Sequence, residues 1–418
     1  MKLTKIKKIA LALTALTTLT AAGAGAKSIV KDAAEMVEDE NARILNVMAK
    51  IRRGEEVHIA AFGGSITTGY NSSNLNEKSW RALVGQWWKE KAAEYGADLK
   101  YLHEGVSGTD SAYGAARAQF HLIENKVDLV FLEFAMNDQW LEAGVRNRSY
   151  EGLIRQIENN SESGIFALFV NERNSPQPSQ QKEQQPICEY YHIPFVSWKD
   201  CEIKEKGDSL DWNLYFDGTE SIHPNDAGHG EIAKFIIQKL ESIWALLPEN
   251  DADLPEIQKS LPAPLTDRGY EFLSFYNCDN LKPVKNTGWS NGSPVHSEWV
   301  AHGNSSEGWR ATEEGAEIVF KVKGTSVNIL FAESDGFRNC QAWVKYGGKE
   351  SKKFTLKCEN SIRQGYLGWS SKELVKTDKE TTFEVHIIVP KGRANYKGRE
   401  TNICGIIVTH EDASKKKD

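Results

Sequence analysis

Ser65 is the residue in this chain best placed to act as a nucleophile. It follows the apolar run 57–62, which predicts a buried strand, and the pair Gly63-Gly64, which allows a sharp turn. A hydroxyl on such a turn, at the carboxyl end of a strand, is open to attack a carbonyl carbon, although glycine and serine are also ordinary turn residues. Because serine is a weak nucleophile at neutral pH, this chemistry needs a base that removes its proton.

His223 is the candidate base. A neutral imidazole can take the proton of the serine and return it to the leaving alcohol. Two carboxylates precede His223 closely and could orient the ring: Glu220, three residues before it, and Asp217, six residues before it. His229 falls within the start of a predicted helix and is expected to be structural. A purely structural explanation of this segment is that Pro224 leads into that helix. It accounts for the proline but not for the histidine that precedes it.

Two further turns follow predicted strands. Gly108 comes after the strand-like run 99–104, and Asn137 comes after the apolar run 128–135. The carboxyl ends of parallel strands meet at one edge of a sheet, so both residues would lie near Ser65. Gly108 has no side chain and lets the backbone approach a substrate, whereas Asn137 could instead cap the element that follows it.

These motifs occur in the order found in the SGNH/GDSL hydrolase family, which the chain resembles over residues 45–246. The resemblance implies a serine hydrolase without a cofactor, in which Ser65 and His223 act with Glu220 as the acid. It also implies an oxyanion hole, whose donors would be the backbone N–H groups of Ser65 and Gly108 and the side-chain amide of Asn137. The chain departs from the family pattern at Gly64, where the family often has Asp, and at Glu220, where it usually has Asp.

Strand-like and helix-like segments alternate through residues 27–246, which predicts parallel pairing with right-handed crossovers. The expected strands are 57–62, 99–104, 128–135, 164–170 and 193–198. Apolar stripes predict helices around 80–88 and 232–243. Tyr113 and Arg117 are expected to be packing and surface residues. The predicted fold class is α/β, a three-layer α/β/α parallel sheet of the SGNH type.

The composition changes after the α/β part. Residues 247–267 are rich in proline and acidic side chains and predict a linker, or a strap across the surface. Strand-like runs then occupy residues 268–412, which predicts an all-β sandwich, and residues 413–418 form a tail. Two of these runs, 317–323 and 326–332, are separated by the turn signal Lys-Gly-Thr. The tryptophans of this part could stack on sugars, although we expect most of them to pack in the core: Trp289, Trp299, Trp309, Trp343 and Trp369.

The first residues predict export. Several lysines precede the weakly apolar run 9–24, and Ala24-Gly25-Ala26 provides small residues for cleavage, so residues 1–26 are similar to a secretory signal peptide. The mature protein would begin near Lys27 and be secreted, periplasmic or attached to the cell surface. No later segment has the length and apolarity of a membrane span. The formal net charge of −7 argues against a nucleic-acid partner.

The six cysteines permit disulfides in an exported protein. Cys188 and Cys201 flank the fifth expected strand and could pair with each other. The spacing of the cysteines has no metal-site signature, so we predict no metal.

The leading functional hypothesis is a secreted serine esterase that removes acetyl or other small acyl groups from a polysaccharide through an acyl-enzyme. Its partner would be an acylated carbohydrate, because similar sandwich modules accompany carbohydrate esterases of the SGNH group. One alternative is a lipase, arylesterase or acyltransferase that uses the same triad. Another is a carbohydrate-binding protein whose hydrolase fold is inactive. The sequence predicts neither the sugar, nor the acyl group, nor the oligomeric state.

Overall fold

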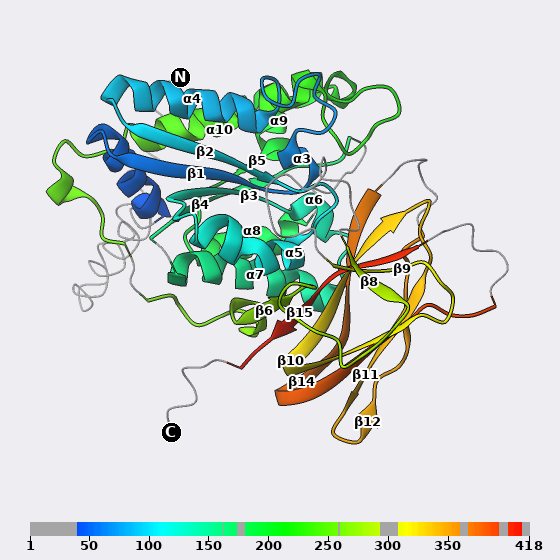
Figure 1. Cartoon of the computed structure of the whole chain (residues 1–418). Helices are drawn as coiled ribbons and strands as arrows, with labels where there is room; N and C mark the ends of the chain where they lie inside the picture. The colour runs from blue at the N-terminus through cyan, green and yellow to red at the C-terminus, as the bar shows by residue number, and fades with distance from the viewer. Residues whose placement is uncertain are drawn as a thin grey trace, which may run out of the picture.

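The computed structural model describes residues 40–160, 162–173, 180–257, 260–292, 308–359, 367–392 and 400–411. The predicted signal peptide, Trp299 and the predicted tail lie outside the described residues. Within them, an α/β part is followed by a part built of antiparallel strands (Figure 1). The predicted fold class is therefore confirmed.

The α/β part is organised around a parallel sheet of five strands in the order β2-β1-β3-β4-β5. The strands are β1 (Glu56–Gly63), β2 (Asp98–Gly105), β3 (Leu129–Glu133), β4 (Gly164–Phe169) and β5 (Phe195–Ser197). The strand order reverses between β1 and β3, and open α/β sheets bind their ligands in the crevice at such a point. Ser65 follows β1 and Asn137 follows β3, so the two candidates flank this crevice.

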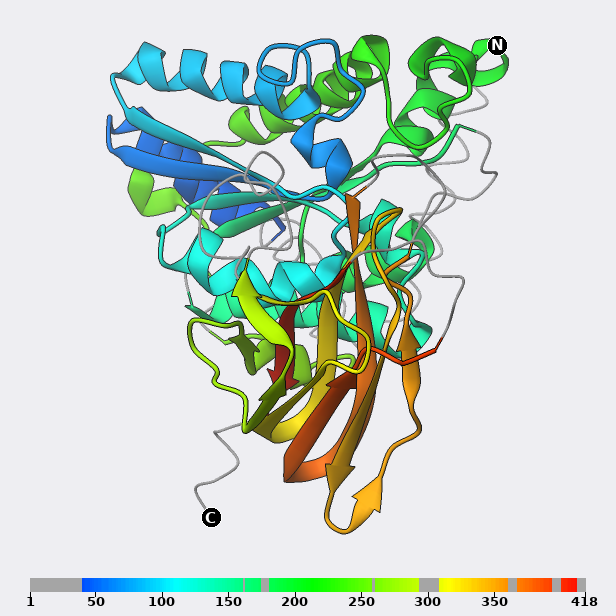
Figure 2. The ribbon, with the colours of Figure 1, turned by 45° about the vertical axis from the view of Figure 1, so that its right-hand side comes forward.

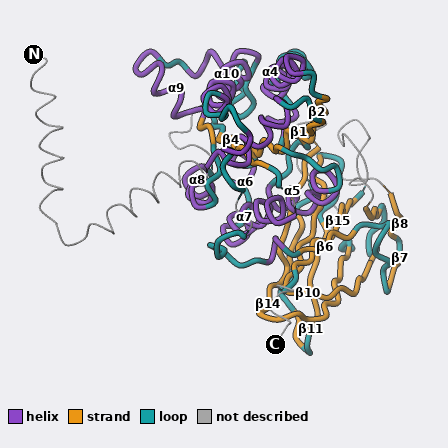
Figure 3. The backbone as a smooth tube through the Cα atoms, turned by 90° about the vertical axis from the view of Figure 1, so that its left-hand side faces the viewer, coloured by secondary structure: helices purple, strands orange, loops and turns teal. Residues whose placement is uncertain are grey.

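Helices cover both faces of this sheet (Figures 1 and 3). On one side lie α4 (Trp80–Tyr95), α9 (Trp198–Lys206) and α10 (Asp226–Trp244), and on the other lie α5 (Ser111–Ala118), α7 (Ala143–Asn160) and α8 (Gln181–Tyr190). Alternate residues of β1 explain the two layers, because Val57 and Ile59 pack in the core beneath α4 and α10, whereas Ala60 and Phe62 pack beneath α5 and α7. A helix also covers residues 40–52, and shorter helical turns are α3 (Ser65–Thr68), α6 (Ala135–Asp138) and the π-helix Gln119–Ile123.

The second part is a β-sandwich. Its strands are β6 (Leu273–Tyr276), β7 (Lys285–Thr287), β8 (Trp289–Gly292), β9 (Gly308–Ala311), β10 (Glu317–Ser334), β11 (Cys340–Tyr346), β12 (Lys349–Glu350), β13 (Phe354–Leu356), β14 (Leu367–Ile388) and β15 (Thr401–Thr409). β10 and β14 pair along most of their length. One half of β10 also pairs with β7 and the other half with β15, so these long strands bend through both layers.

The prediction of two strands at 317–323 and 326–332 was wrong, because β10 runs through both. The pairing with β14 shifts between Gly324 and Ser326, which marks a β-bulge rather than a turn. A side chain at Gly324 would overlap Val408 and the carbonyl of Thr409 on β15. Gly324 therefore allows the backbones of β10 and β15 to approach closely. In the sequence, the same glycine was interpreted as the end of a strand.

Four of the five sandwich tryptophans are described, and all four are buried. Trp289, Trp309 and Trp369 belong to the sandwich core, and Trp343 stacks on His386 with 4.9 Å between ring centroids. The expectation that most of them pack in the core is therefore confirmed for three of the described four, and Trp343 is buried outside that cluster.

The predicted linker is tied to the α/β part. The carboxylate of Glu151 on α7 accepts hydrogen bonds from the backbone N–H groups of Leu265 (2.6 Å) and Thr266 (2.7 Å). Arg155, one turn further along, forms a buried ion pair with Glu271 at 2.7 Å. The sandwich therefore begins from a segment that is fixed against α7, and the two parts lie side by side (Figure 2).

The suggested disulfide is not formed. All six cysteines lie within the described residues, and no two of them are joined in a disulfide. Cys188 is buried on α8, where its sulfur lies 3.5 Å from the hydroxyl of Tyr150, while Cys201 lies on α9 on the other side of the sheet. The two cysteines lie on either side of β5 in the sequence. The helices that carry them, α8 and α9, cover opposite faces of the sheet, so the two thiols do not meet.

Candidate active site

The turn that carries Ser65 depends on two glycines. A side chain at Gly63 would overlap Thr67 and the carbonyl of Glu133, and a Cβ at Gly64 would lie 2.9 Å from the amide oxygen of Asn137. Ser65 then begins the short helix α3 and is 9% exposed. The glycines thus let the chain leave β1 sharply and place the serine at the crevice, with the Asn137 side chain directly beside the turn.

Ser65 and His223 meet there. The Oγ atom of Ser65 lies 2.8 Å from Nε2 of His223, although the two residues are 158 positions apart in the sequence. His223 comes from the loop before α10, whose first turn is capped by Asn225. This distance and direction suit transfer of the serine proton to a neutral imidazole.

Glu220 lies on the other side of the imidazole. Its Oε2 atom is 3.5 Å from Nδ1 of His223, longer than a normal hydrogen bond, and Nδ1 has no hydrogen-bond partner among the described residues. Its other oxygen accepts backbone N–H groups from Ser221 (2.9 Å) and Ile222 (3.0 Å). The carboxylate is therefore held at the right edge of the ring, and a small rotation would close the remaining gap.

Asp217 is directed elsewhere. Its Oδ1 accepts a hydrogen bond from the side-chain amide of Asn225 at 2.9 Å, and its carbonyl accepts one from the N–H of Glu220, also at 2.9 Å. Asn225 in turn accepts from the N–H of Gly228. Asp217 thus supports the turn and the cap of α10, and the structure brings Glu220, not Asp217, next to His223.

Tyr70 and Asn71 also contact His223, and sequence reasoning missed both. The Tyr70 ring packs against the imidazole with 4.5 Å between centroids, and the Asn71 amide donates to the His223 carbonyl at 3.0 Å. Asn71 has a φ of 70°, in the left-handed region that asparagine tolerates better than most residues. The segment after the Ser65 turn therefore holds the loop that carries His223, a role that leaves no pattern in a single sequence.

His229 supports this arrangement from α10. It is fully buried; Nδ1 accepts the N–H of Trp80 (3.3 Å), and Nε2 lies 3.2 Å from the carbonyl of Tyr70. One donor and one acceptor require the neutral ring with its proton on Nε2. Burial lowers the pKa of His229 to about 4.

This buried histidine predicts a loss of stability in acid. The unfolded chain binds a proton on His229 below its ordinary pKa near 6.5, whereas the folded chain does not until about pH 4. The contribution of the neutral His229 to the free energy of unfolding is therefore fully present above pH 6.5. It falls by up to about 3 kcal/mol as the pH drops toward 4. Urea unfolding at pH 7.5 and pH 5 should show a smaller pH effect for His229→Gln than for the wild type. Equal pH effects in the two proteins would exclude this contribution.

The three expected oxyanion donors come from neighbouring strand ends. Gly63 pairs with Gly105 of β2 and with Glu133 of β3, so the loops that follow leave the sheet at the same level. Gly108 has a φ of 74° in the loop after β2, and Ser107 in that loop donates to the hydroxyl of Thr68 on α3 at 3.3 Å. Asn137, on α6, lies against Gly64.

Two buried ionisable residues, Arg117 and Glu133, contact the turn that carries Ser65. Arg117, expected at the surface or in packing, is only 1% exposed; it donates to the carbonyl of Gly63 at 3.2 Å and lies over the ring of Phe62. Burial lowers the pKa of its guanidinium to about 10. Glu133 accepts a hydrogen bond from Thr67 at 3.0 Å, and burial raises its pKa to about 8, which favours the neutral acid at pH 7. Arg117 is therefore a support of the turn that carries Ser65 rather than a surface residue.

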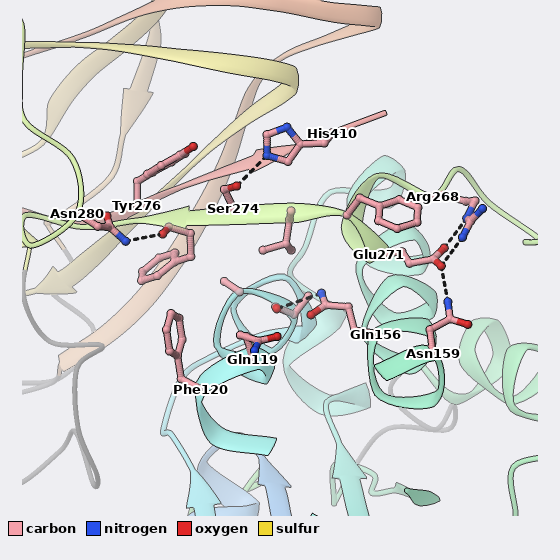
Figure 4. A pocket seen from close by; sticks show the side chains of 15 residues that line it. Gln119, Phe120, Gln156, Asn159, Arg268, Glu271, Ser274, Tyr276, Asn280 and His410 are labelled. Atoms are coloured by element: carbon pink, nitrogen blue, oxygen red, sulfur yellow. Dashed lines mark hydrogen bonds and ion pairs between the residues drawn. The ribbon is translucent and has the colours of Figure 1, made fainter. Parts of the chain in front are cut away.

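A separate hollow of about 810 Å³ lies between the end of α5 and the sandwich (Figure 4). Its lining includes Phe120, Asn159, Tyr276 and His410, and none of the candidate catalytic residues. The hollow is therefore not the candidate active site.

No group of three or more histidine, cysteine or acidic side chains is arranged to hold a metal within the described part of the chain. Among the same residues, no helix combines the length and apolarity needed to cross a membrane.

Comparisons with known proteins bear on the family and the fold of the chain. Residues 61–230 match the GDSL-like lipase/acylhydrolase family. The structure is similar to that of a two-domain esterase active on acetylated mannans, co-crystallised with mannopentaose, with a TM-score of 0.75, 23% identity and coverage of 89% of this chain and 96% of that one. A second structure, also titled as a two-domain esterase active on acetylated mannans, gives a TM-score of 0.76 at 22% identity, with the same coverage. The search of curated protein sequences found no match.

Proposed function

Since this chain belongs to the GDSL-like lipase/acylhydrolase family, we propose that it is a serine esterase that removes acetyl or other small acyl groups from a polysaccharide. The observation that carries the proposal is the 2.8 Å contact between Ser65 Oγ and His223 Nε2, with Glu220 beyond the imidazole. An inactive carbohydrate-binding protein would have no need to keep these three groups in line.

The proposed reaction has two steps. His223 takes the proton of Ser65 as its oxygen attacks the ester carbonyl, and the resulting imidazolium then gives that proton to the leaving sugar hydroxyl. This leaves an acyl group on Ser65. Water attacks the acyl-enzyme with His223 again as the base, which releases the carboxylic acid and restores the serine.

Negative charge develops on the carbonyl oxygen in both steps. We assign its stabilisation to the N–H groups of Ser65 and Gly108 and the amide of Asn137. The segments that carry these donors follow neighbouring strands of the sheet. Removal of one such donor typically costs about 3–4 kcal/mol of transition-state stabilisation. Because these donors belong to the fold, they require no reorganisation as the charge forms.

The choice of a polysaccharide is supported by architecture. The structural relatives that share both parts of this chain are described as active on acetylated mannans. A substrate panel tests the choice: the protein should hydrolyse p-nitrophenyl acetate faster than long-chain esters and release acetate from an acetylated mannan, xylan or pectin. A preference for long-chain esters would favour the lipase alternative, and transfer of the acyl group to an added alcohol would favour an acyltransferase. Export is part of the proposal, and the mature protein should begin near Lys27.

Glu220→Gln is expected to lower kcat by about 10²- to 10⁴-fold. A neutral amide cannot stabilise the imidazolium, but it can still accept the N–H groups of Ser221 and Ile222, so the loop should keep its shape. Asp217→Asn is the matched control, with an expected loss below about tenfold, because its oxygen can still accept from Asn225. Kinetics with p-nitrophenyl acetate would measure both. A larger loss in Asp217→Asn would move the acid to Asp217, and two near-normal rates would indicate a Ser–His dyad.

A further inference from the structure

The loop that carries Gly108 lies at the edge of its own sheet. It follows β2, which is the outermost strand next to β1 and has no neighbour on its other side within the described sheet. On the inner side, the loop is tied to the sheet by the N–H of Val106, which donates to Gly63 at 2.9 Å, and by the bond from Ser107 to Thr68. Gly108 itself has a positive φ. A loop of this kind needs support from outside the sheet if its N–H groups are to stay in place.

The sandwich provides that support. Val106 and Tyr113, which lie before and after Gly108, are buried in the apolar cluster of the sandwich rather than in either core of the α/β part. Trp369 on β14 stacks on Tyr113 with 5.9 Å between centroids and an angle of 8° between the rings. The loop is thus held between its own sheet and a strand that comes from the other domain.

A hydrogen bond reaches the loop directly. The hydroxyl of Ser371, two residues after Trp369 on β14, donates to Oδ2 of Asp110 at 3.2 Å. The other oxygen of this carboxylate accepts the N–H of Tyr113 at 2.9 Å and so caps α5. Asp110 lies two residues after Gly108 and is buried. Ser371 therefore fixes the end of the Gly108 loop at the point where it enters α5.

The same junction connects the two outer oxyanion donors. The N–H of Ser111 donates to Asp138 at 2.8 Å, and Asp138 directly follows Asn137. Asp138 is fully buried and is also held by the amide of Gln184 at 2.6 Å. Displacement of Asp110 would consequently affect both the Gly108 loop and the turn that carries Asn137.

We propose that Ser371 and Trp369 of the sandwich are positioning residues for the oxyanion hole, so that the sandwich is part of the catalytic unit. The inference rests on the proposed function, because it takes Gly108 and Asn137 as donors to the reacting carbonyl. It assigns to β14 a role in the chemical step that does not depend on whether the sandwich also binds sugar.

The test uses the full chain and p-nitrophenyl acetate, a substrate too small to need a polysaccharide site. Ser371→Ala should lower kcat about tenfold with an unchanged KM, because a displaced donor loses its effect mainly in the transition state. Ser371→Thr keeps the hydroxyl and should restore most of the rate. A small alkylboronic acid, which forms a tetrahedral adduct with an active serine, should bind Ser371→Ala more weakly by a similar factor.

Glu373→Gln is the matched control. Glu373 lies two residues further along β14 and also contacts the α/β part, through Arg148 at 2.9 Å, but it does not contact the Gly108 loop. Its kcat should stay within about twofold of the wild type even if the melting temperature falls as much as in Ser371→Ala. Equal losses of kcat in Glu373→Gln and Ser371→Ala would show a general effect of the interface and would overturn the assignment.

Other results also decide the matter. A raised KM with an unchanged kcat in Ser371→Ala would place the residue in substrate binding and contradict the proposal, as would failure of Ser371→Thr to restore the rate. Trp369→Leu should lower kcat in the same direction at temperatures where circular dichroism shows it folded. If Ser65→Ala is inactive while Ser371→Ala has the wild-type kcat, this inference fails and the proposed esterase stands. Full activity of Ser65→Ala would instead remove the proposed function itself.

Discussion

Replacement of Ser65 by alanine is expected to lower kcat for p-nitrophenyl acetate by about 10⁴-fold or more. The change removes the oxygen that lies 2.8 Å from His223, and among the described residues the serine hydroxyl has no other hydrogen-bond partner that the turn or α3 would lose. The variant should therefore fold normally, with a circular dichroism spectrum and melting temperature close to those of the wild type.

Ser72→Ala is a suitable control for this experiment. Ser72 lies in the segment just after α3 and its hydroxyl donates to the carbonyl of Gly69 at 2.7 Å, so the variant also removes one serine hydroxyl near the site. Its activity should remain within a few-fold of the wild type. A folded Ser65→Ala protein that keeps a tenth of the wild-type kcat would end the assignment of Ser65 as the nucleophile.

His223→Ala is expected to be about as damaging as Ser65→Ala, because the serine then has no base and the leaving alcohol has no acid. The combined variant should be little worse than either single one, since residues that act as one unit do not have additive effects. Steady-state kinetics of the three proteins would measure this. Losses that multiply in the double variant would mean that the two residues do not work together.

His229→Gln separates the two histidines near the site. This residue contacts backbone groups of Trp80 and Tyr70 and does not touch Ser65. A loss of kcat below about tenfold is expected, together with a lower melting temperature at neutral pH. If His229→Gln proved as inactive as His223→Ala while still folded, the base would have to be reconsidered.

The sequence predicted the site better than it predicted the rest of the molecule. Ser65, Gly108 and Asn137 each follow an apolar run, and parallel pairing brings the ends of such runs together whatever the details of the helices. Glu220 was chosen over Asp217 because SGNH/GDSL family members carry their Asp at this spacing from the histidine, and the structure places the Glu220 carboxylate beside the imidazole. These inferences needed local patterns, one rule of topology and the resemblance to the SGNH/GDSL family.

What could not be predicted depends on contacts between distant segments. The continuity of β10 depends on β14 and β15, which pair across its bulge, and a Lys-Gly-Thr sequence carries no sign of that pairing. The burial of Arg117 depends on the backbone of Gly63 and the ring of Phe62. The contact between Ser371 and Asp110 joins two polar residues of a kind found throughout the sequence.

The contact between Ser371 and Asp110 has a consequence for the order in which the protein matures. The two residues are separated by 261 positions, so their bond can form only after a chain growing from its N-terminus has extended as far as β14. Domains generally fold as units during synthesis, N-terminal first, and the parallel sheet with Ser65 and His223 is complete in sequence long before β14 leaves the ribosome. If β14 positions the Gly108 loop, the nascent protein carries both its proposed nucleophile and its proposed base without a finished oxyanion hole while the residues between His223 and Ser371 are made. The full rate of the proposed reaction would then be reached only once β14 has been made and has packed on the Gly108 loop.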